Sequence, residues 1–357
     1  LDFVPYALRE RVERKHVQLH TLQLPQYTAL FFNQKEEPAL QNNDIRIALA
    51  FALDRDRIVR ESIKGEGQVI EGPVLPGFPG YLPDMAKTPY DVTEANKKLD
   101  AASERIPADS YRAIRAEALV KERIAALSAT STSSEISTST LASSTEAFVL
   151  TEEMRQSIED DIKQALDVEL SEAQTFYRKQ KDGAFLELTL VTADTPEYRQ
   201  AAHMIAGFWQ EIGVKTVLRF VPPKEMTREV VRGRRYDVLL YGAIVGADPD
   251  PYPFWHSSQR EFPGLNLAGY ANKNADALLE KARTAANEAE TVDLYVKFQE
   301  ILLADRPVVF LYTPIYTYAT NDRVKGIELS RVFHPSDRFA DVIHWYIQTD
   351  GKWRFRK

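Results

Sequence analysis

Two closely spaced aspartate residues, Asp248 and Asp250, have the type and spacing that most clearly indicate chemistry in this sequence. Each precedes a proline, and both follow the apolar run Tyr236–Tyr241, which is typical of a β-strand. The prolines restrict the backbone and so hold the carboxylates in few orientations. Aromatic residues that include Tyr241 and Trp255 lie nearby in the sequence. Carboxylates beside aromatic surfaces suit a cationic or zwitterionic small ligand, so we predict a binding cleft here.

Each residue of this region also has a structural interpretation. For Asp248 we favour a ligand role, in which its carboxylate accepts a charge-assisted hydrogen bond from a ligand ammonium group, over a turn that caps its own backbone. For Asp250 we favour the turn. Asn266 and Tyr270 are equally consistent with holding a ligand and with fixing their own loop. Trp255 is more typical of a core residue, although we keep it as a candidate aromatic wall.

Patterns that would indicate catalysis are weaker. Residues 256–258 and 334–337 place histidine and serine close in sequence, but catalytic triads are assembled from separate segments and no Gly-x-Ser-x-Gly motif occurs. Asp248 and Asp250 lie too close in sequence to be the expected pair of a glycosidase. The chain has no cysteine and no His-x-x-x-His motif. We therefore predict a protein without enzymatic activity, metal or cofactor.

Composition limits the remaining classes. The chain has 357 residues, of which 44% are hydrophobic and 10% aromatic, enough to build two domains or one two-lobed unit with a sizeable core. A net charge of −7 argues against a nucleic-acid partner. No apolar run reaches the ~18 residues that span a bilayer. Because the chain begins at Leu1 without a signal-peptide pattern, we expect a piece of a longer protein.

The first hundred residues predict alternating elements and one long loop. A short helix at 5–15 runs into an extended segment at 17–22, and the apolar run 27–32 predicts a buried strand. Residues 42–62 carry capping side chains and then a helical apolar repeat, and Gly65 would end this helix. Within it, Arg46 and Asp54 are interpreted as a structural ion pair or cap. The Gly- and Pro-rich stretch 65–90 predicts loop.

The middle of the chain has a different character. Between Ser128 and Thr145, thirteen of eighteen residues are Ser or Thr, so almost nothing there can be buried and we expect flexibility. The flanking stretches 111–127 and 152–181 are helix-prone, which predicts a helical hairpin. From 184 onward the pattern predicts strands at 185–191, 214–221, 236–241 and 308–312, and helices at 196–212, 224–232, 274–288 and 291–305.

Several short motifs occur in an order and at spacings that are typical of one protein family. They are Tyr27-x-x-Leu30-Phe31-Phe32-Asn33, Arg46-x-Ala48-Leu49-x-x-Ala52-Leu53-Asp54-Arg55, Gly233-x-x-Tyr236-Asp237, Asp248-Pro249-Asp250-Pro251 and Asn266-x-x-x-Tyr270. Together they resemble the type-5 extracellular solute-binding proteins, which deliver oligopeptides, dipeptides or related solutes to ABC importers.

The resemblance implies an α/β, periplasmic-binding-protein-like (type II) lobe, with a largely parallel sheet flanked by helices and a helical low-complexity insertion. On this basis we expect residues 1–26 to be a remnant of the amino-terminal lobe and hinge. Residues 27–100 and 184–315 would form the carboxyl-terminal ligand-binding lobe, 101–183 the insertion, and 316–357 the return segment toward the other lobe.

The same resemblance implies a function and a set of ligand-binding residues. An aspartate in this loop, here Asp248, commonly pairs with the amino group of a bound peptide; a tryptophan often precedes it by three positions, where this chain has Val245. Aromatic surface is then expected from Tyr241, Trp255 or Tyr270, with Asn266 as a polar contact.

We accordingly expect an exported, periplasmic or cell-surface monomer, with a lipid anchor as one possibility. It would bind a peptide or other small solute by closure of two lobes and interact with a membrane permease but no nucleic acid. The alternatives are a ligand-sensing module of the same fold in a regulatory protein and, less favoured, a hydrolase.

Overall fold

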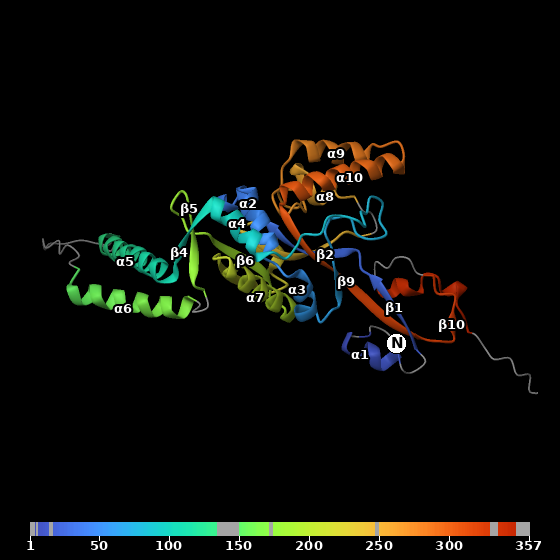
Figure 1. Ribbon diagram of the computed structural model, residues 1–357, viewed down its shortest axis with the longest axis horizontal. Helices are drawn as coiled ribbons and strands as arrows, with labels where there is room; N and C mark the ends of the chain where they lie inside the picture. The colour runs from blue at the N-terminus through green and yellow to red at the C-terminus, as the bar shows by residue number, and fades with distance from the viewer. Residues whose placement is uncertain are drawn as a thin grey trace, which may run out of the picture. The chain divides into compact units, whose positions relative to one another are not determined.

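The structure is a computed structural model that describes residues 4, 6–13, 17–133, 150–170, 174–246, 250–328 and 335–347. The chain divides into two compact units (Figure 1). The first comprises Leu1–Ala101 with Glu187–Lys357, and the second comprises Ala102–Leu186.

A seven-stranded sheet forms the centre of the first unit, with the order β1-β9-β2-β8-β6-β7 and with β3 paired to β9. Its strands are β1 (Val17–Gln23), β2 (Gln26–Phe32), β3 (Gly67–Val69), β6 (Glu187–Ala193), β7 (Lys215–Val221), β8 (Val238–Ile244) and β9 (Val308–Asn321). β6 pairs in parallel with β7 and β8, whereas the other pairings of this sheet are antiparallel. The predicted α/β class is confirmed, but the parallel part of the sheet is confined to these three strands and the sheet is not largely parallel as expected.

The parallel strands are connected as the sequence predicts. Helix α7 (Pro196–Glu211) follows β6, and its N-cap Thr195 accepts a hydrogen bond from Tyr198 N. Proline at the first helical position suits this start, because its missing N–H has no partner there in any case. The helix packs against β6 and β7. The helix predicted at 224–232 is a single π-helical turn, η2 (Thr227–Val231).

Asp237 holds three strand ends together. Its Oδ2 accepts a hydrogen bond from Thr189 N at 2.7 Å, at the start of β6. Its backbone oxygen accepts one from Asn33 N at 2.8 Å, just after β2. This carboxylate therefore fixes the register of the parallel strands, which fits the structural role expected for a residue at the entry of β8.

The single helix predicted at 42–62 is two helices, α2 (Asn43–Phe51) and α3 (Arg55–Ser62). The prediction was wrong because the apolar repeat continues across the break, while Asp54 caps the second helix by accepting a hydrogen bond from Arg57 N. Arg46 is buried and donates to the backbone oxygens of Leu40 and Arg306. Both residues are structural, as expected, but they act as separate caps and not as an ion pair.

Two aromatic clusters mark the packing of the first unit. Trp209 of α7 lies 6.5 Å from Phe32 between ring centroids, and its Nε1 donates to Leu49 O at 3.0 Å. Phe310 of β9 lies 5.9 Å from Trp255. The remaining elements of this unit are α1 (Tyr6–Glu13), η1 (Pro38–Gln41), α4 (Val92–Ala102), α8 (Tyr252–Trp255), η3 (Ser257–Gln259), α9 (Lys273–Arg283), α10 (Glu288–Asp305), β10 (Val324–Lys325), η4 (Pro335–Phe339), η5 (Val342–His344) and β11 (Tyr346–Ile347).

The second unit is a two-stranded ribbon, β4 (Ser103–Pro107) and β5 (Phe176–Gln180), with the helices α5 (Ala108–Ser133) and α6 (Glu152–Glu169). The predicted second helix ends at Glu169, not at 181. Phe176 and Tyr177 favour a strand there, and the Tyr177 ring stacks on Tyr111 at 3.8 Å.

The Ser/Thr-rich tract falls partly within this unit. Its first residues, through Ser133, belong to α5, contrary to the expectation that the tract has no regular structure. Residues 134–149 lie outside the described part of the chain. Among the described residues, no helix combines the length and apolarity needed to cross a bilayer.

Candidate functional site

The carboxyl ends of the parallel strands form the candidate site. β6 ends at Ala193 and β8 at Ile244, and in open α/β sheets ligands bind beyond such ends. Ile244 leaves 71% of its surface exposed, so apolar surface is available there. The loop after β8 begins with Val245, whose N donates to Pro25 O at 2.8 Å. Asp248 belongs to this loop but lies outside the described residues, which resume at Asp250.

Beside this edge lies a group of hydroxyl side chains that the sequence analysis did not single out. Thr28 of β2 lies opposite Gly242 of β8 on one side and opposite Tyr312 of β9 on the other, and the hydroxyl group of Tyr198 from α7 lies beside Gly242. Gly242 of β8 leaves the space that the Tyr198 ring needs, since a Cβ at this glycine would lie 2.9 Å from the Tyr198 hydroxyl oxygen. A signal for Tyr198 was available, because it falls in the first turn of the helix after β6.

Burial keeps these phenols neutral. Desolvation raises the pKa of Tyr198. Desolvation likewise raises the pKa of Tyr312. Neutral hydroxyl groups both donate and accept hydrogen bonds. Thr28 and Tyr312 are buried, so Tyr198 is the member of this cluster with accessible surface.

Trp255, a predicted site residue, lies in the core. Only 1% of its surface is exposed, and its ring lies 6.3 Å from Phe31 and 5.9 Å from Phe310 between centroids. Tyr241 is half-buried on β8 and packs against the same core cluster. Of these two aromatic candidates, Tyr241 is the one with accessible surface.

Asn266 and Tyr270 form a closed hydrogen-bonded turn. Asn266 is fully buried, and its Nδ2 donates to the backbone oxygens of Trp255, His256 and Tyr270. Its Oδ1 accepts from Tyr270 N at 3.0 Å. The Tyr270 hydroxyl donates to Asp305 Oδ2 at 2.6 Å. Both side chains thus use their polar atoms to hold the protein itself together.

Asp250 has the turn geometry that the sequence analysis favoured. Its Oδ1 accepts from Tyr252 N at 2.9 Å, and its Oδ2 lies 2.8 Å from Nε of Arg283. The guanidinium carbon of Arg283 is 4.1 Å from the centre of the Tyr252 ring. Asp250 therefore fixes the beginning of α8 against α9.

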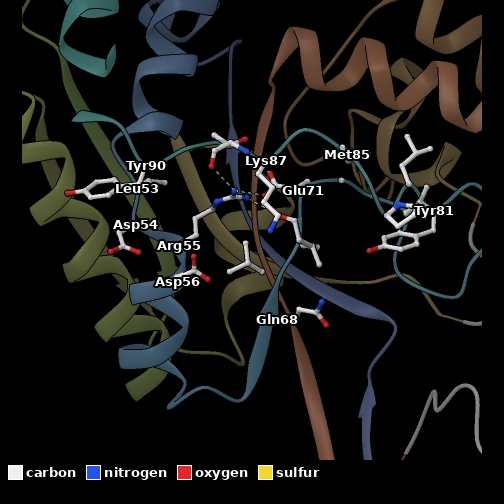
Figure 2. Close-up of a pocket in the computed structure, with 17 residues that line it drawn as sticks. Leu53, Asp54, Arg55, Asp56, Gln68, Glu71, Tyr81, Met85, Lys87 and Tyr90 are labelled. Carbon is white, nitrogen blue, oxygen red and sulfur yellow. Dashed lines mark hydrogen bonds and ion pairs between the residues drawn. The ribbon is translucent and has the colours of Figure 1, made fainter. Parts of the chain in front are cut away.

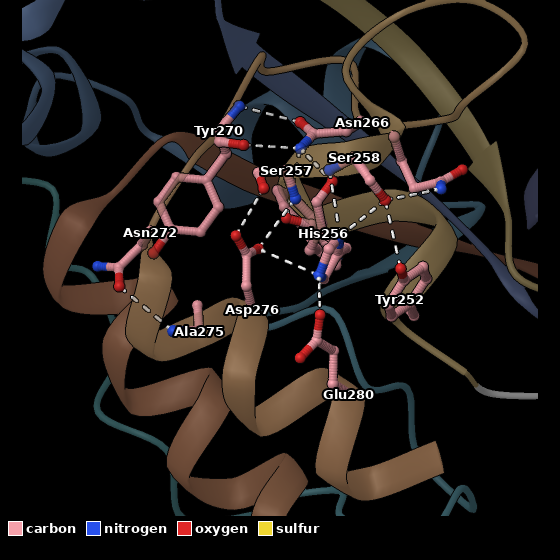
Figure 3. A network of polar contacts seen from close by, with 12 residues as sticks. Tyr252, His256, Ser257, Ser258, Asn266, Tyr270, Asn272, Ala275, Asp276 and Glu280 are labelled. Atoms are coloured by element: carbon pink, nitrogen blue, oxygen red, sulfur yellow. Dashed lines mark hydrogen bonds and ion pairs between the residues drawn. The ribbon is translucent and has the colours of Figure 1, made fainter. Parts of the chain in front are cut away.

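The histidine and serine residues at 256–258 form a polar network (Figure 3). His256 lies between Ser258, whose Oγ is 2.8 Å from Nδ1, and Glu280, whose Oε1 is 3.3 Å from Nε2. Nδ1 also accepts from Ser258 N at 3.1 Å, so the imidazole caps the 3₁₀ turn η3. Ser257 donates both its N–H and its hydroxyl to Asp276 of α9. The contacts with Glu280 and Asp276 attach this turn to α9.

A second concave region lies beside α3. This pocket of about 330 Å³ has the Arg55 guanidinium and Glu71 in its lining, and Figure 2 shows Tyr81 and Tyr90 on opposite sides of that pair. Arg55 donates to Ile70 O at 3.0 Å and contacts Glu71 Oε1 at 2.7 Å. Arg55 and Glu71 are therefore occupied in holding the 70–88 loop.

Within the described ranges, no group of three or more histidine and acidic side chains is arranged to hold a metal ion. His334, which the sequence analysis weighed together with Asp337, lies outside these ranges.

Comparisons with known proteins agree with this architecture. Residues 4–147 match the model of the bacterial extracellular solute-binding proteins, family 5 Middle. The oligopeptide-binding protein AppA of Bacillus subtilis (strain 168) is 24% identical over 169 residues, which cover 47% of this chain and 30% of AppA.

The solved structures extend the likeness of the fold to nearly the whole chain. The structure of AppA from Bacillus subtilis in complex with a nonapeptide matches with a TM-score of 0.63 and 20% identity over 97% of this chain. NikZ from Campylobacter jejuni in complex with Ni(L-His) matches with a TM-score of 0.61 and 18% identity over 97% of this chain.

The chain spans only part of these proteins, 56% of the AppA chain and 57% of the NikZ chain. The family and AppA are named as binding proteins, not as enzymes. On these matches, residues 4–147 are similar to the bacterial extracellular solute-binding proteins of family 5, and the chain shares the fold of the solved structures.

Proposed function

We propose that this chain provides the carboxyl-terminal ligand-binding lobe of a solute-binding protein that captures peptides for an ABC importer. The observation that carries the proposal is the cluster of Tyr198, Thr28 and Tyr312 beside the carboxyl ends of β6 and β8, in which Tyr198 provides the accessible surface. Parallel strands that are covered by helices leave these ends as the open edge for a ligand. AppA, which has the same fold, is solved with a nonapeptide.

In this proposal Tyr198 and Tyr241 contribute hydroxyl and aromatic surface, and Asp248 accepts a hydrogen bond from the ligand ammonium group. Trp255, Asn266 and Tyr270 support the site from beneath, because their buried contacts hold the segment that follows the ligand loop. Binding would favour closure of two lobes and involve no chemical step. His256 and Ser258 would then be structural, so Ser258→Ala should leave ligand binding unchanged.

Residues 316–357 are proposed as the return segment toward the second lobe. Its described part exposes five large apolar side chains within nine residues, at 48% for Phe339 and Val342, 84% for Ile343, 60% for Tyr346 and 67% for Ile347. An apolar patch of this density is typical of a surface that another body covers. The protein would act outside the cytoplasm, next to the permease of the importer.

Calorimetry tests the peptide proposal. The chain and a longer polypeptide with both lobes should be titrated with di-, tri- and nonapeptides, free amino acids and the nickel–histidine complex. We expect peptides to bind the two-lobed protein and to bind the isolated chain more weakly, because part of the enclosing surface is missing. Binding of the nickel–histidine complex alone would replace the peptide assignment. Absence of binding by a folded two-lobed protein would overturn the proposed site.

A further inference from the structure

The short strand β3 has a free edge. Among the described residues it pairs with β9 alone, so no strand lies on its other side. Glu66, just before β3, accepts a backbone hydrogen bond from Ile315 N of β9 at 3.0 Å. Because backbone groups alternate in direction along a strand, Gln68 faces β9 as well, whereas the N–H and C=O groups of Gly67 and Val69 face outward. An edge of this kind is a template to which an extended peptide can add.

A pocket lies along this edge. It is the region of about 330 Å³ beside α3, and its lining includes Gln68 and Val69 of β3 and Asp56 near the start of α3 (Figure 2). Tyr81 and Tyr90 belong to the same lining and are exposed. The volume is at the lower end of the ~300–1,000 Å³ range of ligand pockets, so the site suits a short ligand and not a long chain.

Two charged side chains of this lining are available to a ligand. Asp56 belongs to α3, Lys87 belongs to the 70–88 loop, and both are exposed. Within the described part of the chain, neither side chain takes part in a hydrogen bond or an ion pair. Arg55 and Glu71 differ, because they already bind each other and the backbone. A free carboxylate and a free ammonium group together complement a zwitterion.

We propose that this pocket binds a short zwitterionic peptide, which adds to the free edge of β3 as an extended strand. In an antiparallel pair, hydrogen-bonded positions recur at every second residue, so contact with both Gly67 and Val69 needs about three residues of the peptide. The terminal ammonium and carboxylate groups of such a tripeptide would face Asp56 and Lys87. The site goes beyond the proposed cleft at the ends of β6 and β8, because all of its lining belongs to the first unit and none of it comes from that cleft.

Hydrogen exchange of backbone amides, followed by NMR, tests the added strand directly. The chain is titrated with trialanine, a tripeptide that carries both terminal charges and only methyl side chains. At saturation, exchange of the Gly67 and Val69 amides should slow at least about tenfold, because their N–H groups gain partners. Gln68 is the control within the same strand, since its N–H already faces β9, and its exchange should change less than about twofold. Free alanine, which cannot reach both positions, should give no such protection.

Charge variants test the terminal contacts. Asp56→Asn and Lys87→Gln should each weaken trialanine binding at least about fivefold in calorimetry, since each removes one charge-assisted hydrogen bond. Asp84→Asn is the matched control, because this exposed carboxylate of the same loop lies outside the pocket lining, and it should leave the dissociation constant unchanged. Trialanine with an amidated carboxyl terminus should lose its dependence on Lys87 and keep that on Asp56.

A backbone variant tests the edge itself. Val69→Pro removes one outward N–H and leaves the bonds to β9 in place, as proline is tolerated in an edge strand where the N–H would face solvent. It should weaken trialanine binding at least about fivefold, because the peptide then lacks one donor. Thermal unfolding checks that the variant is folded. If it is not, the exchange data and the charge variants still decide the proposal.

Three results would overturn the proposal. They are unchanged exchange of Gly67 and Val69 at about 10 mM trialanine, a concentration above the dissociation constant of even a weak site, equal protection of Gln68, which would indicate general stabilisation, and binding that neither charge variant affects. The peptide proposal for the two-lobed protein is decided separately, because loss of binding there would not alter the exchange of β3 amides in this chain.

Discussion

Asn266 and Tyr270 are joined by two hydrogen bonds of opposite direction: Asn266 Nδ2 donates to Tyr270 O at 2.9 Å, and Tyr270 N donates to Asn266 Oδ1 at 3.0 Å. An amide side chain donates and accepts at the same time, which a carboxylate or a hydrocarbon cannot do. The pair closes the segment between α8 and α9 from within the protein.

Replacing this amide should destabilise the fold. Asn266→Ala leaves several buried backbone groups without partners, and we expect a loss of about 2–4 kcal/mol in the free energy of unfolding. Asn274→Ala is the matched control, because that side chain is exposed, and should change stability by less than about 0.5 kcal/mol. Urea denaturation measures both. Equal stabilities would mean that the loop is held by other contacts.

Replacing Arg55 should also strongly lower the free energy of unfolding. Its buried guanidinium contacts Glu71 and donates to Ile70 O, Phe310 O and Thr88 O. Arg55→Ala leaves Glu71 as a buried carboxylate without its partner, and a loss of about 3–5 kcal/mol is expected.

Limited proteolysis adds a local readout of the same change, since the 70–88 loop should become susceptible to cleavage. Arg57→Ala, which removes an exposed i,i+4 pair with Glu61, should cost about 0.3–0.5 kcal/mol. A loop that stays resistant in Arg55→Ala would contradict the role of Arg55 as its anchor.

Substitutions at Gly242 and at Tyr198 should have coupled effects on stability. In Gly242→Ala the new methyl group meets the Tyr198 hydroxyl at 2.9 Å, so the ring must move. We expect a loss of about 1–3 kcal/mol in unfolding free energy, as for other overpacked sites.

The double variant with Tyr198→Phe tests whether this contact is the cause. Removing the hydroxyl should recover part of the loss, which a double-mutant cycle of thermal unfolding measures. Strict additivity of the two changes would show that the glycine is needed for another reason. Under the proposed function, both single variants should also weaken peptide binding.

Because of Tyr236, the stability of the fold should depend measurably on pH in the alkaline range. Desolvation raises the pKa of this phenol to about 12, and its hydroxyl donates to Leu267 O at 2.6 Å. The unfolded chain ionises near pH 10, so the folded state binds the proton more tightly. Its stabilising contribution is complete below pH 10 and is lost as the pH rises through about 12.

Tyr236→Phe should therefore lower stability at pH 8 by about 0.5–1.5 kcal/mol, the usual value of one hydrogen bond. The difference from the unmodified chain should shrink between pH 10 and 12. Denaturant unfolding at several pH values gives both quantities, and a constant difference would exclude the link to this phenol.

The ligand role of Asp248 can be tested in a two-lobed protein. Asp248→Asn should weaken binding of peptides with a free amino terminus by ~1.5–3 kcal/mol, the scale of a hydrogen bond to a charged group. Peptides with an acetylated amino terminus should respond little, because they carry no ammonium group. Calorimetry on both peptide forms decides the matter, since equal losses would remove Asp248 from this role.

The elements that follow strong local signals were predictable from the sequence. Thr195 and Pro196 mark the start of α7, and Gly213, with φ of 83°, follows its end. The break between α2 and α3 was missed because the buried Ile45, Leu49 and Ile58 keep a helical rhythm across it. Pattern alone cannot show that Asp54 takes up a backbone N–H in the middle of such a repeat.

The site was harder to predict than the fold. Tyr198, Thr28 and Tyr312 come from three elements, and their meeting depends on strand order that no local pattern contains. Asn266 was a candidate from the sequence, but the sequence did not distinguish a ligand contact from a role in fixing its own loop, because asparagine serves in both. Burial and hydrogen-bond partners distinguish the two roles, and both are properties of the folded chain.

The ribbon of β4 and β5 makes the second unit a removable module. Ser103 lies opposite Gln180 in this antiparallel pair, so the chain leaves the first unit and returns to it at neighbouring positions. Joining these positions by a short turn closes a small loop at low entropic cost. Insertions are tolerated where chain ends meet in this way. This neck is accordingly where a fluorescent reporter domain can be grafted in place of the second unit, while the first unit keeps its own core.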